Sequence, residues 1–434
     1  MRGMIKRTPS DFKVEEFLSP DFLAGKIAPQ IEAPAAAAAE NSEQPEAAPP
    51  AANAVFTLFR LTKESLSTPE AAAAVARALK LKPGTVAYAG LKDKHARTIQ
   101  HVTIKQEISP DAAVTELPAQ LADSGWTLEK LGPAPRALTP GDIACNRFTI
   151  VARNLTEQEC FDMEEAANLI AVKHDNGERS LRFVNYFGDQ RFGSARHGQG
   201  FLAKHLIKGD FESALKLAIA TESRKDRMQD KIFKRILLEN WGNFKKILPK
   251  LRPCPERRAV ERLANSSGDF RAAFCALPYL TQQLSVYAYQ SHLWNGIARR
   301  VVEKCCAPLG KVIAVDDPFG EMLFPEIAAI APELNGLDLP LLARKTQLLP
   351  PWKEAAESVL KEEGIEVSEL QIPGVRRPFF GEEPRRLLVN ADDFQINHAE
   401  RDESATNNKR KKRTLRFTLP RGCYATVLLR ALGQ

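Results

Sequence analysis

The chain has 434 residues, of which 44% are hydrophobic and 26% are charged, a balance typical of water-soluble globular proteins. No run approaches the roughly 18 apolar residues of a membrane-spanning helix, and no apolar segment follows the basic first residues as in a secretory signal, so we expect a cytoplasmic protein. The length predicts two domains or slightly more, and the net charge of +7 favours a polyanionic partner.

The first part of the chain alternates between candidate strands and one helix. Residues 12–17 and 55–61 are predicted strands, and residues 25–53 between them are rich in Ala, Pro and Glu. Few side chains there can bury apolar surface, so we expect a disordered insertion. Ser67-Thr68-Pro69-Glu70 is typical of a helix start, and we expect a helix over residues 70–81 because Pro83-Gly84 follows.

A turn near residue 90 carries an unusual concentration of charge. It lies between the candidate strands 85–89 and 101–105 and reads Gly90-Leu91-Lys92-Asp93-Lys94-His95-Ala96-Arg97-Thr98. The cations beside Asp93 favour its ionised form, which suits nucleophilic or base chemistry better than acid chemistry. The alternative is an inert turn whose charges contact only water.

The rest of the chain predicts further strands around a helical middle. Residues 203–376 show apolar spacings of three and four, with helices expected at 211–220, 224–241 and 280–303. The flanks predict strands 146–153, 182–187 and 414–419, a helix 157–174, and a mixed apolar segment 424–432. Together these elements predict an α+β core with a mixed or mostly antiparallel sheet.

Cysteine spacing and glycine motifs argue against common cofactors. The chain has seven cysteines with Cys305 and Cys306 adjacent, and it contains no Cys-x-x-Cys pair. This pattern predicts reduced, buried thiols and no metal site. A Walker-type loop, and a Gly-x-Gly-x-x-Gly motif after a strand, are also missing, so we expect no nucleotide cofactor.

Four blocks stand in order along the chain, at residues 6–16, 89–98, 185–193 and 419–426. Together they closely resemble the signatures of the TruD family of tRNA pseudouridine synthases. The charged turn, residues 89–98, resembles the family's central motif. Residues 6–16 resemble its opening Lys-x-x-Pro-x-Asp-Phe-x-Val-x-Glu, and the other two blocks are residues 185–193 and 419–426. The resemblance is strong to about residue 200 and over the last twenty or so residues.

The resemblance implies a pseudouridine-synthase core that an inserted, largely helical domain interrupts. We expect the core in residues 1–202 and 377–434 and the inserted domain in residues 203–376. The implied activity is isomerisation of a uridine in tRNA, at position 13 in the D-stem region, without a cofactor and by a monomer. Asp93 occupies the catalytic-aspartate position of the family, and it could attack the sugar or remove its C2′ proton.

Five further residues match substrate-binding positions of the family. A flipped uracil needs an aromatic face and hydrogen bonds to its edge. Asn185 offers both a donor and an acceptor, and Phe187, two residues later on an expected strand, would face the same side. Lys6 could approach the catalytic carboxylate or a phosphate. Phe12 and Tyr424 match aromatic positions near the substrate, and Tyr424 departs from the Phe of a bacterial relative.

The sequence leaves several residue roles open. Asp142 is a rival carboxylate in a loop rich in Pro and Gly. Lys92 or Lys94 could pair with Asp93 or be solvated. The basic run Lys409 to Arg413, in a segment expected to have little order, could be solvated or contact tRNA phosphates.

Three other functions are compatible with the same residues. They are a non-catalytic RNA-binding protein of this fold, a pseudouridine synthase acting on a different RNA, and a hydrolase using Asp93 with His95. No serine elbow or second paired carboxylate in the sequence supports the hydrolase.

The composition of the insertion generates a prediction. Replacing Pro29 to Ala52 with a short Gly/Ser linker is expected to leave the melting temperature and the activity nearly unchanged, because surface loops change closure entropy only slowly with length. Thermal unfolding of the deleted and full-length proteins checks this. A large drop in melting temperature would show that the segment packs against the fold.

Overall fold

The structure, a computed structural model of the chain, describes residues 4–23, 56–105, 124–195, 197–223, 226–407 and 409–434. The chain divides into two compact units. The first unit comprises Met1–Phe183 with Val389–Gln434, and the second unit is Val184–Leu388. The sequence-based proposal instead places the boundaries after residues 202 and 376. Most of the proposed insertion, residues 25–53, lies outside the described residues.

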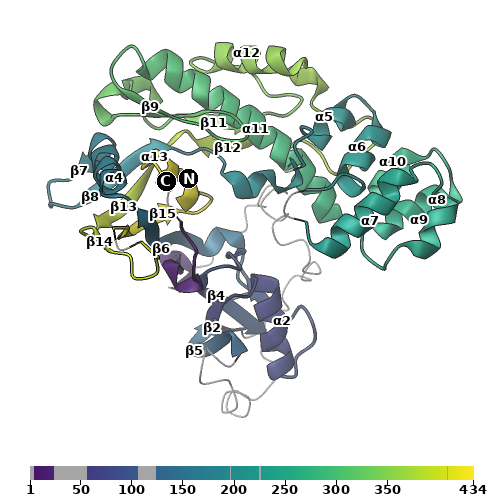
Figure 1. Cartoon of the computed structure of the whole chain (residues 1–434), viewed down its shortest axis with the longest axis horizontal. Helices are drawn as coiled ribbons and strands as arrows, with labels where there is room; N and C mark the ends of the chain where they lie inside the picture. The colour runs from purple at the N-terminus through teal and green to yellow at the C-terminus, as the bar shows by residue number, and fades with distance from the viewer. Residues whose placement is uncertain (1–3, 24–55, 106–123, 196, 224–225, 408) are drawn as a thin grey trace. The chain divides into compact units, whose positions relative to one another are not determined.

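One eleven-stranded sheet forms the first unit (Figure 1). Its order is β5-β2-β4-β1-β6-β15-β13-β8-β7, with β3 beside β4 and β14 beside β15. All pairings that have a defined register are antiparallel except β1 with β4. The expected α+β fold with a mixed, mostly antiparallel sheet is therefore confirmed. The strands are β1 (Phe12–Leu18), β2 (Phe56–Glu64), β3 (Val86–Tyr88), β4 (Arg97–Lys105), β5 (Trp126–Ala134), β6 (Ile143–Leu155), β7 (Ala171–Lys173), β8 (Arg179–Val184), β13 (Leu388–Ile396), β14 (Glu400–Arg401) and β15 (Lys411–Pro420).

Strand β1 lies inside the sheet although it comes first in the chain. It runs parallel to β4, with Lys13 opposite Arg97, and antiparallel to β6, with Phe12 opposite Ile150. Phe12 and Val14 are buried, as the alternation of apolar residues predicts. The start of the chain is thereby fixed beside the strand that follows the charged turn.

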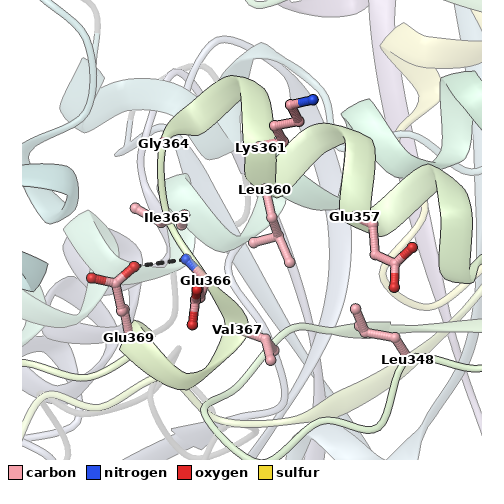
Figure 2. A pocket seen from close by; sticks show the side chains of 9 residues that line it. All are labelled: Leu348, Glu357, Leu360, Lys361, Gly364, Ile365, Glu366, Val367 and Glu369. Atoms are coloured by element: carbon pink, nitrogen blue, oxygen red, sulfur yellow. Dashed lines mark hydrogen bonds between the residues drawn. The ribbon is translucent and has the colours of Figure 1, made fainter.

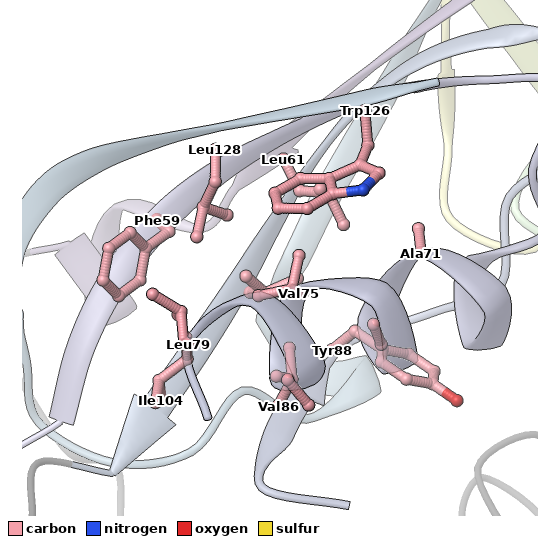
Figure 3. Packing of buried hydrophobic residues seen from close by; sticks show 13 residues of the cluster. Phe59, Leu61, Ala71, Val75, Leu79, Val86, Tyr88, Ile104, Trp126 and Leu128 are labelled. Atoms are coloured by element: carbon pink, nitrogen blue, oxygen red, sulfur yellow. The ribbon is translucent and has the colours of Figure 1, made fainter. Parts of the chain in front are cut away.

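Helix α2 (Thr68–Ala78) packs on the part of the sheet formed by β2, β4 and β5. Its start was predicted correctly: Ser67 and Glu70 form a reciprocal capping box and Pro69 occupies the first turn. Figure 3 shows Val75 of the helix facing Leu61 and Trp126, and Leu79, directly after the helix, beside Phe59. This packing holds the Thr68 end of the helix next to the charged turn.

Some predicted elements of the first unit end earlier or change type. The helix expected over residues 157–174 ends at Leu169 (α4, Glu157–Leu169), because residues 171–173 pair with β8 as strand β7. The expected strand 182–187 ends at Val184, and the segment 424–432 forms helix α13 (Ala425–Ala431). A short helix, α1 (Pro20–Leu23), follows β1.

The second unit is largely helical. Its long helix α11 buries Tyr289 and Trp294, and α12 packs closely on it, since a Cβ on Gly296 would lie 3.2 Å from Val359. Two short strand pairs, β9 with β10 and β11 with β12, complete the unit. The elements are α5 (Leu202–Ile207), α6 (Phe211–Ile219), α7 (Met228–Glu239), α8 (Phe244–Ile247), α9 (Arg257–Asn265), α10 (Phe270–Cys275), α11 (Tyr279–Cys306), β9 (Val312–Val315), β10 (Met322–Pro325), β11 (Asp338–Leu341), α12 (Lys353–Glu363) and β12 (Glu383–Arg386).

The cysteines agree only partly with the expectation of buried thiols. All seven are described and none forms a disulfide, but only Cys160 and Cys306 are buried, whereas Cys275 is exposed. Among the described helices, none has the length and apolar content needed to cross a membrane.

The basic run Lys409 to Arg413 leads into strand β15, and its last residue is part of the folded core. Arg413 is only 3% exposed, and its guanidinium donates to the carbonyls of Asn397 and Cys160 and to Glu164. Lys412 pairs with Glu403 at 2.8 Å. The interpretation of the run as solvated residues is therefore wrong for Arg413, which β15, beginning at Lys411, carries into the core. Contact of the run with tRNA phosphates stays a prediction.

This burial predicts different effects for two residues of the run. Arg413→Met should lower the free energy of unfolding by about 2–4 kcal/mol, because the Asn397 and Cys160 carbonyls lose their donor. Lys409 is exposed, so Lys409→Met should change the free energy of unfolding by less than about 0.5 kcal/mol. Urea unfolding of both variants checks this, and equal stabilities would contradict the structural role of Arg413.

Candidate active site

Asp93 lies in the loop 89–96 that joins β3 to β4. The two strands pair antiparallel, with Tyr88 opposite Val102, so the expected hairpin is present with a longer loop than a tight turn. The Asp93 side chain is 24% exposed. The loop thus presents a carboxylate that solvent can reach, between the end of β3 and the start of β4.

The Lys6 ammonium contacts the Asp93 carboxylate. Its Nζ donates to Asp93 Oδ2 at 2.6 Å, and its own side chain is 25% exposed. The same ammonium lies 4.1 Å from the centre of the Phe12 ring, a cation–π contact. The structure therefore brings together three of the residues that the sequence predicted: Lys6, Phe12 and Asp93.

The segment that carries Lys6 is fixed at both ends to β6. Met4 exchanges two backbone hydrogen bonds with Arg153, and Asp11 closes the 3₁₀ turn Pro9–Asp11 and accepts from Arg153 Nε at 2.9 Å. Arg153 also donates to buried Asp402 at 2.9 Å. Since Asp11 is 2% exposed, the Asp of the opening motif has a structural role, which is to hold the backbone on which Lys6 stands.

Phe12 lies in the core and not on the surface. Its side chain is 2% exposed, and its ring meets Phe148 edge to face at a centroid distance of 6.1 Å. Phe148 in turn stacks on Phe417 of β15. Contact of Phe12 with a substrate base stays a prediction. In the structure, the Phe12 ring packs against the Lys6 ammonium.

The two lysines beside Asp93 in the sequence are bound to other carboxylates. Lys92 Nζ lies 2.5 Å from Glu16 Oε2, and Lys94 Nζ donates to Glu70 at 2.8 Å. Burial raises the pKa of Glu16, but the Lys92 charge and hydrogen bonds from His101 and Lys92 hold it below its ordinary value. These lysines therefore tie the loop to β1 and α2.

Lys63 is a site residue that the sequence analysis missed. Its side chain is fully buried, and its Nζ donates to the carbonyls of Leu66 at 2.7 Å, Asp93 at 3.0 Å and Lys92 at 3.4 Å. Burial lowers the pKa of Lys63 to about 8, although the Asp93 carboxylate acts in the opposite direction. Strand alternation could have revealed it, since Lys63 follows Leu61 on the buried face of β2.

The rival carboxylate Asp142 has a structural role. Its two oxygens accept from the two terminal nitrogens of Arg136 at 2.6 and 2.7 Å, and it also accepts from the Thr139 backbone at 2.8 Å. With a side chain only 6% exposed, Asp142 is held inside this turn. Asp93 is the better candidate for chemistry.

Asn185 and Phe187 belong to the second unit and lie after β8. The alternation argument that put them on one face of a strand is therefore wrong. They gather instead at Arg385 of β12: Asn185 Oδ1 accepts from its Nη2 at 2.7 Å, and the guanidinium carbon lies 4.0 Å from the Phe187 ring centre. A shared arginine, distant in sequence, brings the two residues together.

Both residues are enclosed in this unit. Asn185 and Phe187 are each 4% exposed. The Asn185 Nδ2 donates to the Arg386 carbonyl, and Asn295 makes two hydrogen bonds with the Phe187 backbone. Contact of Asn185 and Phe187 with uracil stays a prediction, as does that of Tyr424, which is half-buried directly before α13.

A groove of about 830 Å³ in the second unit is a different kind of site (Figure 2). Its floor is apolar, with Leu360 and Ile365, and its rim carries three glutamates and one lysine. That charge disfavours an anionic RNA, and the groove contains none of the predicted site residues. The lining is Leu348, Glu357, Leu360, Lys361, Gly364, Ile365, Glu366, Val367 and Glu369.

Within the part of the chain that the structure describes, no three His, Cys, Asp or Glu side chains gather as ligands for a metal ion. In the first unit, Lys6 lies against the Asp93 carboxylate and Lys63 beneath the Asp93 backbone, and this arrangement is the candidate site.

Comparison with known proteins identifies a matching family model. The model described as tRNA pseudouridine synthase D (TruD) matches residues 1–317 and 334–432. The chain is 31% identical over 384 residues to a protein of Methanopyrus kandleri named a probable tRNA pseudouridine synthase D, covering 87% of this chain and 85% of that protein. It is 27% identical over 389 residues to the tRNA pseudouridine synthase D of Aquifex aeolicus, covering 87% and 91%.

The fold also resembles a solved structure. A crystal structure assigned to a tRNA pseudouridine synthase D (TruD) of Methanosarcina mazei superposes with a TM-score of 0.66 at 22% identity, covering 99% of this chain and 93% of that one. At this identity the likeness supports the fold.

Asp402 binds Arg153, which holds the segment that carries Lys6, and the pKa of Asp402 leads to a prediction about pH. Although burial raises the pKa of Asp402, hydrogen bonds from Ser404, Asn154 and Arg153 hold it at about 2. The folded-state pKa lies below the unfolded value of about 3.9, so this stabilisation is complete above about pH 5 and is lost as the pH falls toward 2. Between pH 5 and 2, wild type should lose on the order of 2–3 kcal/mol more stability than Asp402→Asn.

Urea unfolding at a series of pH values measures this difference. Asp175→Asn, in an exposed turn, is the control and should change stability by less than about 0.5 kcal/mol at neutral pH. Parallel pH curves for wild type and Asp402→Asn would contradict the assignment.

Proposed function

The chain belongs to the TruD family of tRNA pseudouridine synthases, and from this premise we propose that it isomerises the uridine at position 13 of tRNA, in the D-stem region, with Asp93 as the catalytic carboxylate. The observation that carries the proposal is the contact between Asp93 and Lys6, made by two motifs distant in sequence. Lys92 and Lys94, which flank Asp93 in the loop, pair with Glu16 and Glu70, so the lysine at Asp93 comes from the other motif and not from its sequence neighbours.

The proposed reaction breaks the bond between uracil N1 and the ribose C1′, turns the base, and joins its C5 to the same sugar carbon. All atoms are conserved, so the reaction requires neither an oxidant nor a nucleotide. Asp93 would either attack C1′ to form a covalent intermediate or remove the C2′ proton to give a glycal. Lys6 supports both routes, because its charge-assisted hydrogen bond orients the carboxylate.

The substrate contacts proposed from the family are Lys6, Phe12, Asn185, Phe187 and Tyr424. In the first unit, the position of Lys6 at the carboxylate and of Phe12 beneath Lys6 supports their part in the site. In the second unit, the common contact of Asn185 and Phe187 with Arg385 supports a joint role for these two residues. We further propose that the protein acts in the cytoplasm, as a monomer on one tRNA.

The catalytic assignment predicts that Asp93→Asn abolishes isomerisation and leaves tRNA binding within about threefold of wild type. The substitution removes the charged oxygen but keeps the size and part of the hydrogen bonding of the side chain. Single-turnover assays on a tRNA transcript, with pseudouridine mapped by position, measure the first effect, and filter binding measures the second.

Two controls make this test specific. Asp175→Asn is the same chemical change in an exposed turn and should keep wild-type turnover. A transcript with cytidine at position 13 should yield no pseudouridine. Turnover by Asp93→Asn equal to that of wild type would exclude the catalytic role, and modification only at another uridine would exclude the proposed position.

A further inference from the structure

A buried ammonium lies directly beneath the loop that carries Asp93. Lys63 stands near the end of β2, and its side chain has no exposed surface. It continues the row of inward-facing residues Phe59 and Leu61, which pack against α2. A charged side chain is unusual at such a position, because burying an ammonium away from water is costly.

The hydrogen bonds of Lys63 go to backbone carbonyls. They reach Leu66 at 2.7 Å, Asp93 at 3.0 Å and Lys92 at 3.4 Å. Two of the three acceptors are the carbonyls of successive residues, so one ammonium restrains the peptide groups on both sides of the Asp93 Cα atom. Lys63, which lies outside the loop, thus donates a hydrogen bond to the backbone of Asp93 itself.

The rest of the loop is held by other anchors. The Lys92 N–H donates to Thr68 Oγ1 at 2.9 Å, and Thr68 in turn donates to Gln100. The side chains of Lys92 and Lys94 bind Glu16 and Glu70. The loop is thus connected to β1, α2 and β4, and Lys63 adds the connection from β2 to the reacting residue.

Burial of the charge works against a lysine at this position. Burial lowers the pKa of Lys63 to about 8, below the unfolded value of about 10.4. Because the folded state releases the proton first, protonated Lys63 destabilises the fold below about pH 8, and this effect is relieved as the pH rises from there toward 10.4. An apolar residue continuing the row of Phe59 and Leu61 would avoid this cost but would leave the loop carbonyls without this donor.

We propose that Lys63 is a positioning residue for the isomerisation, holding the Lys92 and Asp93 carbonyls so that the Asp93 carboxylate meets both Lys6 and the ribose. The proposal rests on the proposed function and adds to it a residue that does not touch the substrate. Misplacing a reacting group by about 1 Å can reduce a rate about 100-fold. Loss of the restraint should therefore affect the chemical step more than tRNA binding.

The test compares Lys63→Met with Leu61→Met in the full-length protein. Lys63→Met keeps the length of the side chain and removes the donor, whereas Leu61→Met changes packing two residues away on the same face of β2 without touching the loop carbonyls. We expect Lys63→Met to fold, to bind tRNA transcript within about threefold of wild type, and to lower the single-turnover rate about 10- to 100-fold. Leu61→Met should keep the wild-type rate.

A second variant changes the hydrogen bond between the same loop and helix α2. Thr68→Val is nearly isosteric and removes the acceptor of the Lys92 N–H. It is expected to lower the single-turnover rate about 3- to 10-fold with tRNA affinity retained, since one of several anchors is lost. If Lys63→Met does not fold, this variant decides the question, and a wild-type rate for Thr68→Val would overturn the proposal.

The remaining outcomes are also decisive. A wild-type rate in Lys63→Met, or an equal loss of rate in Leu61→Met, would overturn the positioning role. A fall in tRNA affinity as large as the fall in rate would do the same. Wild-type protein without isomerase activity would reject the proposed function and this inference with it, whereas active wild type with an unchanged Lys63→Met rejects the inference alone.

Discussion

The parallel pairing of β1 with β4 is the constraint on which the candidate site depends. Lys13 lies opposite Arg97 in that pairing. Because the strands run in the same direction, the segments that precede them emerge at the same end of the sheet. Lys6 precedes one strand and Asp93 precedes the other, so the pairing brings the ammonium and the carboxylate within 2.6 Å. Without it, the opening motif and the charged loop would have no reason to meet.

Two largely enclosed cations, Arg153 and Lys63, hold the segments that carry Lys6 and Asp93. Arg153 holds the segment that carries Lys6 through Asp11 and Asp402, and Lys63 holds the loop that carries Asp93. Buried ionic groups of this kind contribute little net stability compared with apolar residues of similar size. Their effect here is geometric: each one specifies where a loop leaves the sheet, which a purely apolar contact would specify less strictly.

Local sequence patterns predicted the elements whose formation depends on nearby residues. The capping box at Ser67 and Glu70 starts α2 where expected, and the alternation of Phe12 and Val14 gave the correct strand. Predictions were wrong where a distant partner overrides local preference. Residues 171–173 leave the expected helix because they pair with β8, and Asn185 and Phe187 lie outside a strand because they gather at Arg385.

The sequence by itself determined the family, the α+β class and the identity of the candidate carboxylate, because these depend on motifs of adjacent residues. Only the tertiary structure decided which charges face one another. Lys92 and Lys94 flank Asp93 in the chain yet bind Glu16 and Glu70, while Lys6 reaches it from the segment that precedes β1. Adjacent side chains diverge along an extended loop, whereas strand pairing joins residues that are far apart in sequence, and no local pattern records the outcome.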